Sequence, residues 1–324
     1  MDKILVTGAA GFIGYHFSKK LMDLGYKVVG IDNMNSNSQE ILSLKQNRLN
    51  NLEEYSKDNF KIYFEDVKNK IAIRSVFSHE RPPIVIHLAG KAGVRDCTSK
   101  ETECIESNVN GFLNVISLSR DYNVRNFIYA SSSSVYGGCK KLPFFETSDT
   151  SNQISLYGAT KYMNELIAKT YYHNYNFHST GLRFFSICGS YSRPDMAMFL
   201  FTKSIMEGIP IDVYNNGDMS RSFTHIEDIT NCLDKIVEIR FKAQVFNFCS
   251  EEPIELMTLV KAIERETGKR ANIIYKPMFK EDMQHTRGST YKAREDFGFI
   301  PKTKFDNMVI MFIRWYKKQY GGSI

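Results

Sequence analysis

Short runs of β-branched and aliphatic residues alternate with longer amphipathic segments through the first half of the chain. The runs are KILVTG, YKVVGID, KIYFED, PIVIHLAG and VRNFIYASSSS. Between the first two, Phe12, Ile13, Phe17 and Leu21 recur at the spacing of one helix face. Strand, helix and strand in repetition indicate parallel strands joined by crossover helices. The pattern therefore predicts an α/β fold with a doubly wound parallel sheet.

The clean alternation fades after about residue 185, where the segments become rich in Met and Asn. We therefore expect a first domain over residues 1–185, to which some later segments return, and a smaller lobe over residues 186–324. Residues 36–55 are polar with leucines at helical spacing, which predicts an extra helix after the second strand. The tail FDNMVIMFIRWYKKQY predicts an amphipathic closing helix with Trp315 in the core.

Composition narrows the class of ligand. The 42 basic and 36 acidic residues give a net charge of +6, and the basic residues are scattered, which favours a small anionic ligand over nucleic acid. No apolar run reaches the roughly 18 residues of a membrane span, and no His/Cys cluster predicts a metal site. We expect a cytoplasmic protein whose six cysteines are free thiols, namely Cys97, Cys104, Cys139, Cys188, Cys232 and Cys249.

Glycines follow the first predicted strand in the stretch TGAAGFIG. Gly8, Gly11 and Gly14 allow a tight turn and a close approach to a pyrophosphate, while the following helix N-terminus favours negative charge. Asp32 ends the next strand and is placed to accept hydrogen bonds from an adenosine ribose. Its neighbour Asn33 is not an arginine, which favours NAD over NADP. These residues predict a Rossmann-type NAD-binding domain.

Serines end another predicted strand in ASSSSVYG, at the sheet edge where open α/β sheets bind ligands. Tyr157 and Lys161 follow, one helical turn apart. A phenol acts as a base near neutral pH only if its phenolate is stabilised, and a neighbouring ammonium does this. Serine, tyrosine and lysine together are a working set for the oxidation of a carbinol.

The order of these motifs resembles the extended short-chain dehydrogenase/reductase superfamily. More narrowly, GIDNMN, KAGVR, YASSSSVYG, SLYGATKYMNEL, TGLRFFSICG, SRPDMAMF and IDVYNNGDMSRSFTHIEDI resemble the nucleotide-sugar 4-epimerases that act on UDP-glucuronate. The resemblance spans nearly the whole chain and is loosest after residue 270. It implies tightly bound NAD and C4 epimerisation of a nucleotide sugar, from UDP-glucuronate to UDP-galacturonate, in the service of polysaccharide biosynthesis.

The resemblance also implies roles for individual residues. Tyr157, Lys161 and Ser132 are the catalytic residues. Serines at 133 and 134, where related dehydratases carry an acidic pair, argue against dehydration and, less firmly, against decarboxylation. The implied cofactor-binding residues are Gly8, Gly11, Phe12, Ile13, Gly14, Asp32, Asn33, Asp66, Val67, Leu88, Ala89 and Lys161. The implied substrate-binding residues are Arg95, Ser132, Ser133, Ser186, Arg193, Arg221, Lys280 and Arg287.

Several features leave alternatives open. The loop GKAGVRDC introduces Lys91 and Asp96 beside the predicted sugar pocket, and Ser186 replaces the threonine of the related enzymes. The alternatives are an epimerase for a different hexose or heptose, a decarboxylase, a ketoreductase and, more remotely, a non-catalytic NAD-binding scaffold. A homodimer is expected through the helix that starts near Tyr157 and the one around residues 104–121, with Ile116, Tyr171 and Tyr172 on the outer faces.

Overall fold

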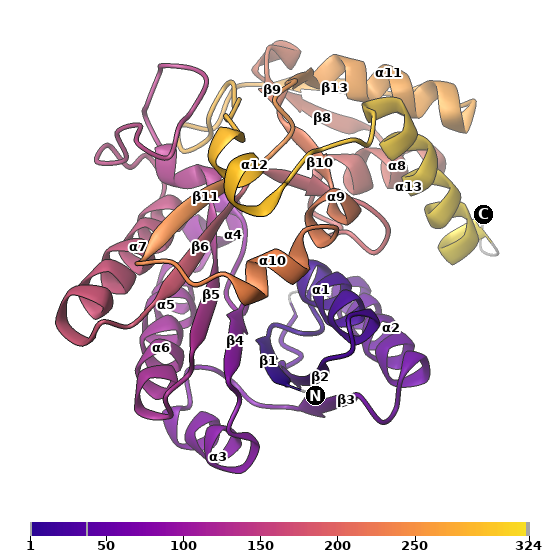
Figure 1. Cartoon of the computed structure of the whole chain (residues 1–324). Helices are drawn as coiled ribbons and strands as arrows, with labels where there is room; N and C mark the ends of the chain where they lie inside the picture. The colour runs from indigo at the N-terminus through magenta and orange to yellow at the C-terminus, as the bar shows by residue number, and fades with distance from the viewer. Residues whose placement is uncertain (1, 37, 322–324) are drawn as a thin grey trace.

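A seven-stranded parallel sheet forms the centre of the computed structural model, which describes residues 2–36 and 38–321 (Figure 1). Its strand order is β11-β6-β5-β4-β1-β2-β3, with every neighbouring pair parallel. The strands are β1 Lys3–Thr7, β2 Lys27–Ile31, β3 Phe60–Tyr63, β4 Ile84–His87, β5 Asn126–Ser132, β6 Ser179–Phe184 and β11 Gln244–Phe248. The predicted doubly wound sheet is confirmed.

Helices cover both faces of the sheet, because alternate strand residues point to opposite sides. Ile4 and Val6 of β1 face one apolar core, and Leu5 between them faces another. The first face carries α1 Phe12–Asp23, α2 Gln39–Tyr55, α9 Ile226–Thr230 and α10 Leu233–Glu238. The second carries α3 Lys70–Glu80, α4 Val94–Ser99, α5 Glu101–Ile105, the π-helix η1 Glu106–Asn110, α6 Gly111–Asp121 and α7 Leu156–Tyr175.

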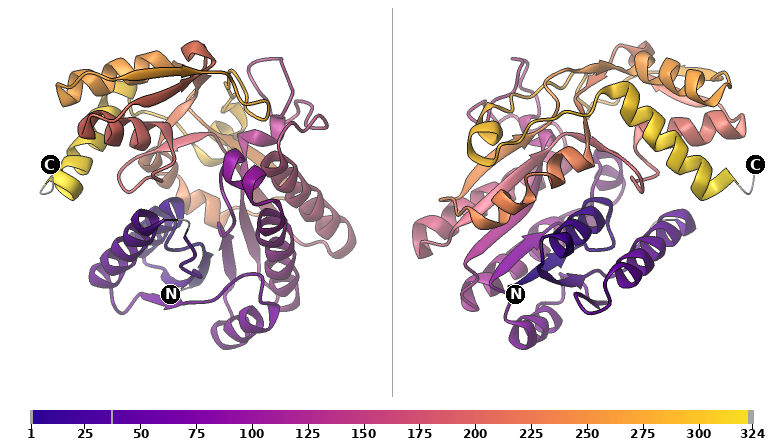
Figure 2. Two further views of the ribbon diagram at one scale, coloured as in Figure 1. Left: turned by 180° about the vertical axis from the view of Figure 1, so that it is seen from behind. Right: turned by 45° about the vertical axis from the view of Figure 1, so that its right-hand side comes forward.

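A second lobe lies beyond the carboxyl ends of the sheet strands, as the three views show (Figures 1 and 2). Its own core is built from α8 Ala197–Glu207, α11 Leu256–Thr267 and α13 Phe305–Tyr320. Three two-stranded pairs complete it, from β7 Ser186–Cys188, β8 Ile211–Tyr214, β9 Ser220–Arg221, β10 Phe223–His225, β12 Ile254–Glu255 and β13 Ile273–Lys276. The remaining helices within the described residues, all short, are η2 Ser133–Tyr136, η3 Asn215–Gly217 and α12 Tyr291–Phe297.

Helices predicted outside the regular alternation are present. Residues 36–55 contain α2, whose N-cap Ser38 accepts a hydrogen bond from the Ile41 amide. The closing helix is α13, and Trp315 packs against the core of the second lobe, as expected. Among the described residues, no helix is long and apolar enough to cross a membrane, and no group of three His, Cys, Asp or Glu side chains gathers to hold a metal ion.

Two expectations from the sequence are wrong. Cys97 and Cys104 form a disulfide, so they are not free thiols, and only the other four cysteines are free. Their separation of seven residues looked unlike any paired motif, but a turn between α4 and α5 brings them together. Ile116 is fully buried in the core between α6 and the sheet, so it cannot contribute to an outer face.

Candidate active site

The glycine loop after β1 forms the first part of the site. Gly8 has φ +73°, and a Cβ at this position would lie 2.8 Å from the Ala89 backbone nitrogen, so only glycine fits. A Cβ on Gly14 would lie 2.1 Å from the carbonyl oxygen of Gly8. The first turn of α1, with Phe12 and Ile13, therefore packs directly on the loop, and no side chain caps this helix N-terminus. Such a backbone cradle fits a diphosphate.

Asp32 directly follows β2 beside this loop and is 5% exposed. Its carboxylate accepts hydrogen bonds from the amides of Ala10 (3.1 Å) and Met34 (2.9 Å) and from the Lys45 ammonium (2.8 Å). The Ala10 contact fixes the acid against the glycine loop, as a ribose-binding acid requires. Lys45 comes from α2, and the sequence interpretation missed it because nothing in the spacing of 13 residues indicates a contact.

The remaining predicted cofactor residues border the same edge of the sheet. Asn33 donates its side-chain amide to Asp66 (3.0 Å), so these two polar groups lie together after β2 and β3. Val67 is buried. Leu88 and Ala89 follow β4, where the Ala89 amide donates to the Thr7 hydroxyl (3.1 Å). With the glycine loop and Asp32, they form one continuous border that fits a dinucleotide such as NAD.

Ser132, Tyr157 and Lys161 meet at the end of β5. Ser132 is the last residue of this strand, and α7 starts beside it because the Ser155 hydroxyl caps the helix by accepting from the Gly158 amide (3.0 Å). Tyr157 and Lys161 then project from the first two turns. The Lys161 ammonium donates to the Ala130 carbonyl (3.2 Å) and lies 5.9 Å from the centre of the Tyr157 ring.

Burial shifts the pKa values of these two groups in opposite directions. Burial lowers the pKa of Lys161 to about 8. Burial also raises the pKa of the Tyr157 phenol, while the positive charge of Arg193 and a hydrogen bond with the Ser132 side chain lower it. The carboxylate of Asp195 raises it again. Tyr157 is therefore close enough to Arg193 and Asp195 for both charges to influence its proton.

A buried polar network anchors α7 to the strands of the central sheet. Glu165 and Arg183 form a two-pronged ion pair with N–O distances of 2.7 and 2.8 Å, and their side chains are 0% and 3% exposed. The Ser131 hydroxyl donates to Glu165 (2.6 Å), and Arg183 donates to the Tyr136 hydroxyl (2.9 Å). The network joins the strand that carries Ser132 to the helix that carries Tyr157. Glu165 could have been found from the sequence, since positions 157, 161 and 165 share one helix face.

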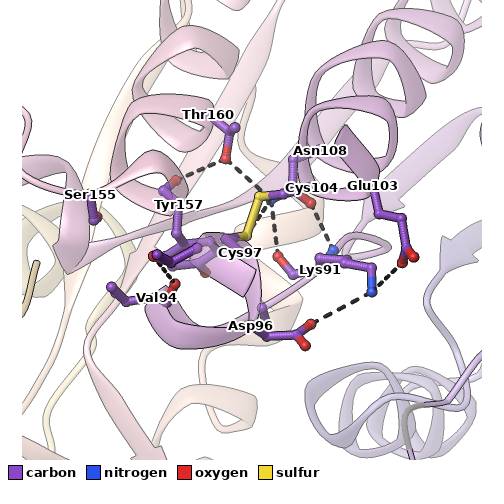
Figure 3. Close-up of a disulfide and its surroundings, with 12 residues drawn as sticks. Lys91, Val94, Asp96, Cys97, Glu103, Cys104, Asn108, Ser155, Tyr157 and Thr160 are labelled. Carbon is purple, nitrogen blue, oxygen red and sulfur yellow. Dashed lines mark hydrogen bonds and ion pairs between the residues drawn. A yellow bond between two sulfur atoms is a disulfide. The ribbon is translucent and has the colours of Figure 1, made fainter. Parts of the chain in front are cut away.

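Asn108, in η1, is a second residue that the sequence interpretation missed. Its carbonyl oxygen accepts from the Lys91 amide (2.7 Å), and its amide donates to the Lys91 carbonyl (3.0 Å) and to the Thr160 hydroxyl (3.1 Å). Thr160 in turn donates to the Tyr157 carbonyl (2.8 Å). Figure 3 shows this chain of contacts, which ties the loop after β4 to the first turn of α7.

The two unexpected charges of that loop neutralise each other. Lys91 pairs with Asp96 (3.6 Å) and with Glu103 (2.6 Å), on the side of the Cys97–Cys104 disulfide shown in Figure 3. Lys91 is thus held by carboxylates of the chain itself. The disulfide and this ion-pair cluster together bind α4 to α5.

Arg95, carried by α4, reaches across to the second lobe. Its guanidinium lies 4.3 Å from the ring centres of both Tyr214 and Phe279. Nearby, Arg221 donates to the Asp282 carboxylate (2.9 Å). The two lobes also meet at one small cavity beside the start of α7. It is lined by Val94, Ser134, Ile154, Ser155, Glu281, Asp282 and Met283.

Arg193 lies beside the loop after β4, where a Cβ on Gly93 would lie 3.1 Å from its Nη2. Its Nη2 donates to the Ala92 carbonyl (2.8 Å) and to Asp195, and its Nε donates to Asp195 (3.0 Å). Ser133 begins η2 after Ser132, and Ser186 begins β7. Arg287 is exposed and donates to the Glu251 carbonyl (3.1 Å), while Lys280 is exposed beside Phe279. Within residues 2–36 and 38–321, no recorded contact joins Arg287 or Lys280 to Tyr157 or Arg193.

The fold and this site together define an α/β enzyme that uses a dinucleotide cofactor and carries a Tyr–Lys pair at the edge of the sheet. Residues 4–249 match the sequence model of the NAD dependent epimerase/dehydratase family, and the chain belongs to that family. Membership agrees with the resemblance seen in the motifs.

Curated relatives cover nearly the whole chain. Protein CapI of Staphylococcus aureus is 39% identical over 98% of this chain and 99% of its own length. UDP-glucuronate 4-epimerase 4 of Arabidopsis thaliana is 37% identical over 99% of this chain and 76% of its own length. Among solved structures, the UDP-glucuronic acid 4-epimerase of Bacillus cereus, in complex with UDP-glucuronic acid and NAD, gives a TM-score of 0.90 at 27% identity. That match covers 98% of this chain and all of the other.

Proposed function

We propose that this chain catalyses the NAD-dependent C4 epimerisation of UDP-glucuronate to UDP-galacturonate. The observation that carries the proposal is that Tyr157 lies near Lys161 and within the electrostatic influence of Arg193. Lys161 supplies the charge that stabilises a phenolate, and Arg193 supplies a guanidinium of the kind that binds a carboxylate. The names of the curated relatives support the choice of sugar.

Each catalytic residue has a defined task in this proposal. Tyr157 removes the proton from the C4 hydroxyl and, after the hexose ring has turned over, returns a proton to the C4 oxygen, with Ser132 sharing a hydrogen bond to that oxygen. Lys161 keeps the phenolate favourable through its charge. When bound, NAD supplies the chemistry of accepting a hydride from C4 and giving it back. No net oxidation results.

Arg193 has a second task, which follows from the chemistry of the substrate. A 4-keto uronate is a β-keto acid and loses carbon dioxide when its C5–C6 bond aligns with the ketone π system. A guanidinium that fixes the carboxylate plane prevents that alignment. Ser186 offers a hydroxyl as a further donor, and Arg95 and Arg221 offer positive charge for the diphosphate. Lys280 and Arg287 are proposed to add charge from the second lobe.

We also propose that the chain works as a cytoplasmic homodimer that supplies UDP-galacturonate for polysaccharide biosynthesis. Large apolar side chains on α6 and α7 support the dimer, because Leu113, Met163 and Leu166 are 42%, 46% and 44% exposed. Tyr171 and Tyr172 lie further along α7 and are partly exposed. The division into an NAD-binding domain over residues 1–185 and a substrate lobe over residues 186–324 remains part of this proposal.

Incubation of the purified chain with UDP-glucuronate, without added cofactor, tests the reaction. The expected product is UDP-galacturonate, identified by chromatography and NMR. Release of carbon dioxide with a UDP-pentose would identify a decarboxylase instead, and a requirement for added NAD(P)H would identify a ketoreductase. The Tyr157→Phe variant serves as the negative control.

A further inference from the structure

Asp195 binds the guanidinium of Arg193 through both carboxylate oxygens, as a substrate carboxylate would. Both of its oxygens accept from one edge of the guanidinium, Oδ1 from Nε and Oδ2 from Nη2. A guanidinium has five N–H bonds. Two of them go to Asp195 and a third, on Nη2, goes to the Ala92 carbonyl. Only the two hydrogens on Nη1 lie outside these contacts.

This arrangement blocks a second two-pronged contact. A carboxylate forks either onto Nε and Nη2 or onto Nη1 and Nη2, so each fork uses one Nη2 hydrogen. Both Nη2 hydrogens of Arg193 are already committed. A uronate therefore cannot grip Arg193 with both oxygens while Asp195 and Ala92 keep their contacts.

Asp195 is the partner that is able to leave. Its side chain is 51% exposed, whereas that of Arg193 is 31% exposed, so water can solvate the Asp195 carboxylate when the pair separates. The Ala92 acceptor, by contrast, is a backbone carbonyl. It belongs to the loop that Asn108 holds in place through its hydrogen bonds with Lys91. Gly93 leaves room beside the pair, since a Cβ there would lie 3.1 Å from Nη2 of Arg193 and 3.6 Å from Oδ2 of Asp195.

The pair also lies near the proposed catalytic residues, because the loop that contacts Arg193 at Gly93 passes Lys161, where a Cβ on Gly90 would lie 3.7 Å from Nζ. We propose that Asp195 is a stand-in for the substrate carboxylate. Its own carboxylate pairs with the Arg193 guanidinium until the carboxylate of a uronate displaces it. This inference rests on the proposed function. It makes Asp195 a residue that determines specificity, because a neutral hexose has no group to exchange for the Asp195 carboxylate.

Binding measurements on an Asp195→Asn variant test the exchange. Asparagine keeps the size of the side chain but removes the charge that competes for Arg193. In the Tyr157→Phe background, which prevents turnover, calorimetry gives the Kd of the NAD-loaded protein for UDP-glucuronate and for UDP-glucose. We expect Asp195→Asn to tighten UDP-glucuronate binding about 1.4-fold to fivefold, the range for loss of one partly exposed ion pair, and to leave UDP-glucose unchanged.

Two matched variants separate exchange from a general charge effect. Asp96→Asn removes the same charge from the same site, but Asp96 pairs with Lys91. It is expected to give a clearly smaller gain. In an Arg193→Ala background the effect of Asp195→Asn is expected to vanish, as a double-mutant cycle requires of a contact that acts only through Arg193.

Three results would overturn the stand-in role. They are equal changes for both sugars, equal gains from Asp96→Asn and Asp195→Asn, and weaker UDP-glucuronate binding in Asp195→Asn, which would mean that Asp195 orients Arg193 for the substrate. If the unaltered chain does not distinguish UDP-glucuronate from UDP-glucose, the proposed substrate and the stand-in role both fail. If it does and Asp195→Asn changes nothing, only the stand-in role fails.

Discussion

Lys161 lies one helical turn after Tyr157 on α7, with its ammonium 5.9 Å from the centre of the phenol ring and hydrogen-bonded to the Ala130 carbonyl. The carbonyl anchors the ammonium to β5, and no carboxylate within residues 2–36 and 38–321 forms an ion pair with it. In the proposed reaction this ammonium offsets the burial that raises the pKa of Tyr157, and it links the rate of proton transfer to the charge on Lys161.

The Tyr157→Phe variant should lose turnover but retain its cofactor. Phenylalanine keeps the ring and removes only the group that accepts the C4 proton, so we expect a decrease in kcat of about 10²-fold to 10⁴-fold. Product formation and the NAD content of the purified protein are the measurements. Tyr162→Phe, on the same helix, is the control and should keep near-normal turnover. A Tyr157→Phe variant with normal turnover would exclude Tyr157 as the base.

The activity should fall as the pH rises through about 8. Burial lowers the pKa of Lys161 to about 8, so the ammonium loses its proton there and no longer stabilises the phenolate. Initial rates between pH 6 and 10 measure the decline, with circular dichroism to confirm that the fold persists. In Lys161→Arg the guanidinium stays charged to beyond about pH 12. This variant should be slower but should lack the decline near pH 8, and an identical decline in both proteins would contradict the assignment.

Breaking the buried Glu165–Arg183 pair should destabilise the protein strongly. Glu165→Gln leaves the Arg183 charge buried with no carboxylate, which typically costs about 3–5 kcal/mol of the free energy of unfolding. Urea denaturation measures the loss. The control is Asp306→Asn, which breaks the exposed Arg265–Asp306 pair and should have no measurable effect. A cost below about 1 kcal/mol for Glu165→Gln would show that the pair does not support α7.

The purified chain should contain four titratable thiols when unfolded without reductant and six after reduction, because Cys97 and Cys104 are joined. Closing so short a loop stabilises the folded state by about 2 kcal/mol, so reductant should lower the thermal midpoint. A Cys97→Ser, Cys104→Ser variant should have this lower midpoint with or without reductant. Six thiols before reduction would contradict the disulfide.

The dimer should depend on the exposed apolar residues of α7. Met163→Glu combined with Leu166→Glu places two charges on the proposed interface, and size-exclusion chromatography with light scattering should then report a monomer. The exposed Ile71, on α3, provides a matched control, since Ile71→Glu should leave the assembly unchanged. A monomeric parent protein would contradict the proposed dimer outright.

Local patterns in the sequence were sufficient to predict the first five strands, the glycine loop and the Tyr157–Lys161 pair, because each depends on spacing within one element or one strand–turn–helix unit. The choice of Ser132 among four consecutive serines came from the resemblance to the family. Lys45, Asn108 and Arg183 were missed because each meets its partner on a different helix, strand or loop, and a single sequence holds no periodicity that pairs residues of separate elements. Ile116 was misplaced for a related reason, since apolar residues look alike on the inner and outer faces of a helix.

The position of β11 beside β6 has a practical consequence. The central sheet takes six strands from residues 3–184 and its seventh from Gln244–Phe248, after the chain has already built much of the other lobe. The two halves of the molecule are therefore interleaved along the gene. A chimera made by exchanging everything after residue 185 with a relative would import a foreign edge strand along with the residues proposed to bind the sugar. Changes of substrate in this scaffold are better engineered by replacing individual loops than by exchanging whole modules.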